Sequence, residues 1–122
     1  MIVIPPVVID SAKLVAADCT IPEPDAARGE VVWVSGGTYA LGVVRVTLDN
    51  HRKYECVTAH SGSAVLPKDD PVNWQDVGAT NRWAMFDTGR NTQSVGPVGA
   101  ALVAPVTPGQ RCNALFLGRL QA

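Results

Sequence analysis

Apolar and polar residues alternate with a period of two in the middle of the chain. Residues 43–48 follow this pattern with β-branched side chains, and residues 53–58 repeat it with Tyr54 and Cys56 on one face. Between them, Asp49-Asn50-His51 consists of residues that tolerate the backbone of a tight turn. The pattern therefore predicts an antiparallel hairpin over residues 43–58.

Shorter apolar stretches predict further extended segments. One is Glu30–Val34, and another begins at Trp74 and continues to Val77. Toward the end of the chain, Ala100–Val106 and Cys112–Leu120 are separated by a Pro-Gly pair that suits adjacent positions of a tight turn. These two stretches predict a second hairpin.

The beginning of the chain carries no regular alternation. Prolines interrupt the apolar residues 2–9, and proline cannot donate to a strand ladder, so this segment is expected to be an edge strand or an extended arm. Asp10 or Ser11 is expected to cap a single helical turn through Ala17. Long helical periodicity is absent, which predicts an all-β fold: a small antiparallel β-domain with an extended N-terminal arm and a C-terminal β-hairpin.

The length of 122 residues corresponds to one domain. We divide it into an N-terminal arm and loop (1–29), a central β-module (30–87) and a C-terminal hairpin that completes the domain (88–122). Charged residues make up only 17% of the chain, against roughly 25% in ordinary globular domains. So few charges are consistent with a surface that is partly covered by partners.

Charge is distributed unevenly, although the net charge is only −1. Residues 1–30 carry five acidic and two basic residues, whereas residues 88–122 carry three arginines and no acid. The two ends could attract each other or neighbouring copies, or these could be scattered solvated charges. The overall balance predicts no nucleic-acid partner and no membrane insertion, and no apolar run approaches the roughly 20 residues of a membrane helix.

The cysteines predict neither disulfides nor a metal site. Cys19, Cys56 and Cys112 are odd in number and form no C-x-x-C pair, so we expect reduced thiols in a protein made in cytoplasm. The N-terminus lacks a positively charged segment before its apolar residues, which argues against a signal peptide. No cofactor is predicted.

The spacing of aromatic residues carries a first resemblance. A spaced series of mostly aromatic, glycine, valine, cysteine, histidine and proline residues runs from residue 33 to residue 74. Its members are Trp33, Tyr39, Gly42, Val44, Tyr54, Cys56, His60, Pro67 and Trp74. This order resembles the small chitin-binding modules of bacterial chitinases (carbohydrate-binding families five and twelve). The resemblance implies a compact antiparallel β-domain. The loop at residues 61–66 lacks the aromatics of that family's sugar platform, so the resemblance supports the fold better than sugar binding.

A second resemblance covers residues 70–87. The sequence Gly78-Ala-Thr-Asn-Arg-Trp-Ala-Met-Phe-Asp87 looks like a segment of tailed-bacteriophage structural proteins, where it follows a chitin-binding-like module. Residues 7–15 are also similar to the start of such proteins. The resemblance implies a structural part of a phage tail (tail tip, baseplate or fibre attachment) located in the virion and assembled in the bacterial host cytoplasm. Other tail proteins and further copies, in a ring or tail-tip assembly, would be its partners.

Candidate contact residues follow from the two resemblances. They could meet a protein partner or, in the alternative function of a carbohydrate-binding module, a host surface glycan. The competing interpretation is structural: the rings fill the core, Asn81 bonds backbone in a turn, and Arg82 pairs with Asp76 or Asp87. The candidates are Tyr39, Trp74, Asn81, Arg82 and Trp83.

No catalytic residue is predicted. His60-Ser61, and His51 with nearby aspartates, are the only suggestion of a hydrolase, and no G-x-S-x-G elbow accompanies them. Asp69-Asp70 lacks the ligand spacing of a calcium loop. The sequence therefore predicts a binding and structural protein rather than an enzyme.

Overall fold

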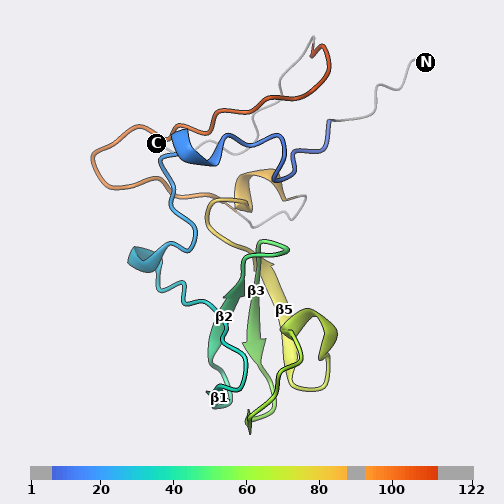
Figure 1. The fold of residues 1–122 in the computed structure, drawn as a ribbon. Coiled ribbons are helices and arrows are strands. Elements are labelled where there is room, and N and C mark those ends of the chain that lie inside the picture. Colours follow the sequence, from blue (N-terminus) through green and yellow to red (C-terminus); the bar gives the residue numbers. More distant parts are fainter. Residues whose placement is uncertain (1–6, 88–92, 113–122) are drawn as a thin grey trace, which may run out of the picture.

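The structure, a computed structural model, describes residues 7–87 and 93–112 (Figure 1). Short strands alternate with single turns of 3-10 helix, and these described residues contain no α-helix. The all-β prediction is confirmed at this level. In chain order the elements are η1 (Ala16–Asp18), η2 (Ala26–Arg28), β1 (Thr38–Tyr39), β2 (Val44–Thr47), β3 (Arg52–Cys56), β4 (His60–Ser61), η3 (Pro67–Asp69), β5 (Trp74–Ala79) and η4 (Ala84–Phe86).

A three-stranded antiparallel sheet forms the centre of the molecule, in the order β2-β3-β5. The predicted hairpin is confirmed, because β2 and β3 pair with Val46 opposite Lys53. On the other side of β3, Cys56 lies opposite Trp74. A register shift between Lys53 and Tyr54 lets β5 accommodate one extra residue. Tyr54 and Cys56 share a buried face as expected, whereas Thr58 is exposed.

A first hydrophobic cluster covers one face of this sheet. A two-stranded sheet, β1 with β4, places Tyr39 opposite His60. The Tyr39 ring meets Trp74 edge-on, with centroids 4.9 Å apart. Trp33 and Val43 pack against the outside of the cluster. We call Tyr39, Tyr54, Cys56 and Trp74 the first cluster.

A second cluster lies beyond the other end of β5, where residues 9–20 lie beside residues 103–107 (Figure 1). It consists of Leu14, Ala79 and Trp83, with Ile9, Phe86 and Ala104 packed against it. Backbone hydrogen bonds join the N-terminal and C-terminal segments here: Val15 N–H donates to Pro105 O (2.8 Å) and Thr20 N–H to Val103 O (2.9 Å). Backbone pairing therefore joins these two segments.

Two predicted strands are wrong. Glu30–Val34 forms only one parallel bridge, between Val32 and Val46, because the side chain of Glu30 turns inward to bind backbone amides. Residues 100–106 form no strand, and only Val106 bridges to Leu14. The partner expected for them, Cys112–Leu120, lies almost entirely outside the described residues, as does the arm at residues 1–6.

The helical turn expected near the start is displaced. Asp10 does cap a turn, since its Oδ1 accepts the Ala12 N–H at 3.1 Å and its carbonyl accepts the N–H of Lys13 and of Leu14. The 3-10 helix itself begins later, at Ala16. The Asp10 turn is what directs Leu14 into the second cluster.

Candidate functional site

The five candidate residues separate into two places. Tyr39 and Trp74 belong to the first cluster, whereas Asn81, Arg82 and Trp83 lie in the turn that follows β5. Trp74 is 2% exposed and Tyr39 5% exposed. The Tyr39 hydroxyl donates to Val34 O (2.7 Å) and accepts the Val34 N–H (2.9 Å). Both rings are thus engaged by the chain's own residues.

A buried carboxylate, Glu23, organises the second place. Its side chain is 5% exposed. It accepts the Thr80 hydroxyl at 2.6 Å and the Trp83 indole N–H at 3.0 Å, and His51 Nδ1 lies 3.0 Å from it. The His51 ring also stacks on Trp83, with centroids 4.3 Å apart. Together with Arg82, these residues form what we call the Glu23 network, which ties the N-terminal loop to the hairpin turn and to the turn after β5.

Arg82 does not pair with Asp76 or Asp87, contrary to the prediction. Its Nε donates to Ile21 O at 2.8 Å, and its Nη1 lies 3.9 Å from the Glu23 carboxylate. The two aspartates belong instead to Arg52, which reaches Asp76 at 2.8 Å and Asp87 at 3.4 Å. Arg52 lies on β3 directly beside β5, whereas the turn after β5 carries Arg82 back toward residue 21.

Asn81 is the centre of a second buried polar group. Its Nδ2 donates to Asp25 Oδ2 (2.7 Å) and Val95 O (2.9 Å), and its Oδ1 accepts the Val95 N–H (2.8 Å). Glu30 accepts the backbone N–H of Asn81 at 2.6 Å and that of Asp25 at 2.8 Å. Asp25, Glu30 and Asn81 are all buried. Asn81 does lie in a turn, but its side chain bonds the distant Asp25 and Val95 and not its own backbone, contrary to the expectation.

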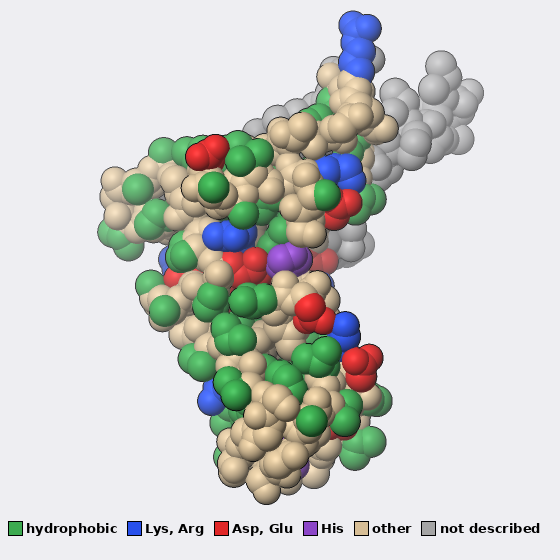
Figure 2. Space-filling model, in the orientation of Figure 1, with side chains coloured by type: hydrophobic (Ala, Val, Ile, Leu, Met, Phe, Trp, Pro, Cys, Tyr) green, Lys and Arg blue, Asp and Glu red, His purple; other side chains and the backbone are tan. Residues whose placement is uncertain are grey.

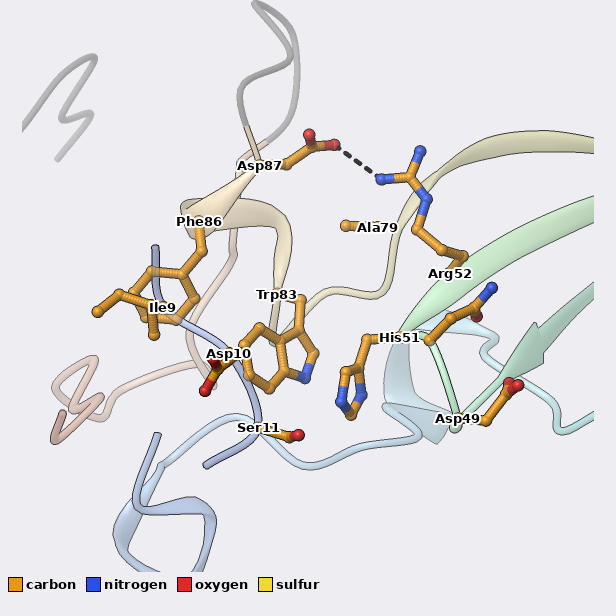
Figure 3. A pocket seen from close by; sticks show the side chains of 11 residues that line it. Ile9, Asp10, Ser11, Asp49, His51, Arg52, Ala79, Trp83, Phe86 and Asp87 are labelled. Carbon is orange, nitrogen blue, oxygen red and sulfur yellow. Dashed lines mark hydrogen bonds and ion pairs between the residues drawn. The ribbon is translucent and has the colours of Figure 1, made fainter. Parts of the chain in front are cut away.

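An open crevice of about 390 Å³ lies beside the Glu23 network, between the N-terminal segment, the hairpin turn and η4 (Figure 3). Trp83, Phe86 and Ile9 provide its apolar wall, and His51 stands against Trp83. On the space-filling surface, a histidine shows in the hollow between the upper segments and the sheet (Figure 2). Hydrogen-bonding side chains line the rest of the crevice: Asp10, Ser11, Asp49, Asn50, Arg52 and Asp87.

Ion pairs hold the charged side chains around the crevice. A hydrogen bond from Lys68 (2.7 Å) keeps the pKa of Asp49 below its ordinary value of 3.8. Lys13 lowers the pKa of Asp10 in the same way. The bidentate contact with Asp76 raises the pKa of Arg52 above its ordinary value. The crevice therefore presents fixed hydrogen-bonding groups on one side and aromatic surface on the other, a combination suited to a small polar ligand.

Sequence reasoning missed the three buried acids. Glu23, Asp25 and Glu30 lie in or next to a Pro-rich loop and resemble ordinary surface charges. The sequence did hold one signal for them. Buried acids require hydrogen-bond donors, and Thr80-Asn81-Arg82-Trp83 is a turn rich in such donors. Their pairing over separations of more than fifty residues has no local pattern.

The histidine considered for catalysis, His60, packs against the first cluster. His60 Nδ1 is 2.9 Å from Thr58 O, and the ring contacts Tyr39 and Trp74. Cys56 Sγ is 3.8 Å from the same ring nitrogen. Ser61 is opposite Thr38 in the small sheet. In the part of the chain that the structure describes, no three or more His, Cys, Asp or Glu side chains group as metal ligands.

Comparison with known proteins found no match to this chain among family models, curated proteins or solved structures. Within residues 7–87 and 93–112, no helix is long and apolar enough to cross a membrane.

Proposed function

We propose that this protein is a structural component of a bacteriophage tail that acts by docking on other tail proteins. The resemblance of residues 70–87 to tail structural proteins supplies the class. The observation that supports docking is the number of large apolar residues that lie exposed on and near the sheet, where a partner could cover them. Large exposed apolar residues include Val31, Val34, Leu41, Val44, Val72 and Val77.

The turn Thr80–Trp83 supports this proposal by its internal role. Its side chains hold the N-terminal loop and residue 95 in place instead of pointing to solvent. A motif that stabilises the fold of a small domain is compatible with a structural protein. The strand β5 ends the three-stranded sheet on one side, and such an edge can pair with a neighbouring chain. The proposal includes a homo-oligomer in a ring or tail-tip assembly, located in the virion.

Purified virions test the proposal directly. Mass spectrometry of the particles should detect the chain, and immunogold labelling should place it on the tail. Absence from intact particles would refute a virion role. Analytical ultracentrifugation of the purified protein tests the oligomer, and a monomer at every concentration examined would contradict it.

A second candidate function is recognition of a host surface glycan, and the crevice of Figure 3 favours it. Sugars bind where aromatic surface adjoins hydrogen-bonding side chains, as Trp83 and Phe86 adjoin Asp49 and Asn50 here. A glycan array read with wild type and Asp49→Asn tests this site. Loss of binding in Asp49→Asn, with the fold intact by circular dichroism, locates the sugar in the crevice. No binding at millimolar sugar removes this function.

A further inference from the structure

A groove of about 500 Å³ runs along the face of the sheet that the first cluster leaves uncovered. Val44 and Val46 of β2, Lys53 of β3 and Val77 of β5 form its floor. Lys53 lies directly opposite Val46, so the strand register puts these side chains on one face. The opposing wall comes from residues 28–30, Asn81, Gln93 and Val95. The volume falls within the roughly 300–1,000 Å³ of ligand sites and suits a few side chains.

Four valines line the groove, and three of them are partly exposed. Val44 is 39% exposed, Val77 44% and Val95 42%, so three valines from three separate segments present surface to the same hollow. Burying a valine side chain contributes about 1.5–3 kcal/mol when it is complete. An occupant with apolar side chains would therefore gain most of its binding free energy from this floor.

Two cations line the groove. They are Arg28 and Lys53, and neither makes an ion pair or a side-chain hydrogen bond with any residue that the structure describes. They differ in this from Lys13, Arg52 and Lys68, which are all paired with aspartates. Unpaired cations beside apolar surface favour an occupant that brings a carboxylate.

Glu30 is the acid that lines the groove, and both of its carboxylate oxygens already accept hydrogen bonds within the protein. Its carboxylate receives the backbone N–H groups of Asp25 and Asn81. The Asp25 carboxylate behind it receives the Asn81 amide. These buried acids offset part of the positive potential of Arg28 and Lys53, so the site favours one carboxylate among apolar side chains over a highly acidic or polyanionic ligand.

We propose that this groove docks an apolar peptide segment carrying a single acidic side chain, supplied by a partner protein. The apolar residues would cover Val44, Val77 and Val95, and the carboxylate would pair with Arg28 or Lys53. The inference rests on the proposed docking function and specifies its partner's chemistry. A second copy of this chain is the competing occupant, and the test separates the two.

The test selects peptides without assuming their sequence. Full-length protein is immobilised and a random peptide library is panned against it, with counter-selection on the triple variant Val77→Ser, Arg28→Gln, Lys53→Gln. Enriched peptides are then synthesised with a fluorophore, and their Kd is measured by anisotropy. Each altered side chain is exposed or half-buried and makes no side-chain hydrogen bond in the described structure, and circular dichroism verifies that the variants fold.

The expected result is enrichment of apolar peptides with one Asp or Glu. Val77→Ser should weaken their binding about fivefold or more, and so should Arg28→Gln with Lys53→Gln. The matched controls Val72→Ser and Arg111→Gln alter an exposed valine and an exposed arginine outside the groove and should leave Kd unchanged. Replacing the peptide's acid by its amide should have the same effect as the Arg28 and Lys53 changes.

Other outcomes overturn the inference. These are no enrichment, enriched peptides without an acidic residue, or binding that the groove variants leave intact. Self-association that Val44→Ser with Val77→Ser abolishes, without peptide binding, would assign the groove to a second copy. Peptide binding is measured on the isolated protein, so its failure is distinguishable from failure of the virion proposal. The groove can fail to bind peptide while the chain is found in virions, and the reverse result is equally readable.

Discussion

The carboxylate of Glu23 accepts the indole N–H of Trp83 at 3.0 Å, across a sequence separation of 60 residues. The same carboxylate contacts His51 and Thr80, so one side chain connects three segments of the chain. A buried carboxylate with these partners stabilises the fold only while all of them are present, because an unpaired buried donor is costly.

Removing this carboxylate should therefore destabilise the protein strongly. We expect Glu23→Ala to lower the free energy of unfolding by about 3 kcal/mol, since it leaves the Trp83 N–H and Thr80 hydroxyl without their acceptor. Urea unfolding followed by tryptophan fluorescence measures the loss. Glu55→Ala is the control, because Glu55 has no side-chain partner in the described structure and should change stability by less than about 0.5 kcal/mol. Equal losses in both variants would contradict the assignment.

Removing the Asn81 amide and replacing it by a carboxylate should both destabilise the protein. Asn81→Ala removes the donor to Asp25 and the paired bonds with Val95, at a cost of about 1–3 kcal/mol. Asn81→Asp should cost more, about 3–5 kcal/mol near neutral pH, because it adds a third carboxylate beside buried Asp25 and Glu30. Protonation relieves this repulsion, so the deficit relative to wild type should shrink at acidic pH. Asn73→Asp, at a half-buried position beside Asp70, should cost less than either change.

Gly37 is required by its closeness to Tyr39. A Cβ at Gly37 would lie 2.6 Å from the Tyr39 hydroxyl, which cannot move away without breaking its bonds with Val34. Gly37→Ala should lower the thermal unfolding midpoint, with a loss of about 1–3 kcal/mol. At Gly96 the same atom would find ordinary contact at 3.5 Å, so Gly96→Ala should have little effect. Calorimetry of both variants gives the comparison.

Acid should weaken the Asp49–Lys68 ion pair. The pKa of Asp49 is lowered in the folded protein, so its contribution is present above its ordinary value of 3.8 and is lost as the pH falls through the lower folded value. Both side chains are about two-fifths exposed, so solvent screening keeps the contribution of the pair small. The stability difference between wild type and Lys68→Gln should therefore vanish in strong acid. Lys53→Gln should show no such pH dependence.

The sequence predicts what local periodicity controls. The β2–β3 hairpin was predictable because residues 43–58 alternate around a turn, and the burial of Tyr54 and Cys56 follows from the same period. The Glu23 network was not predictable, because polar contacts at long separation leave no local pattern. Arg82 and Arg52 illustrate this: both could reach Asp76, and only the pairing of β3 with β5 selects Arg52.

Strand β5 begins in the first cluster with Trp74 and ends in the second with Ala79, so it is shared by two cores of different construction. Strand ladders hold the first core together, whereas a few backbone hydrogen bonds between residues 13–20 and residues 103–107 hold the second. Opening of the second core need not melt the sheet, and the two should differ in amide hydrogen exchange. The amides of Val15 and Thr20 would exchange through such partial opening, while the Cys56 amide, bonded to Val43, would require global unfolding.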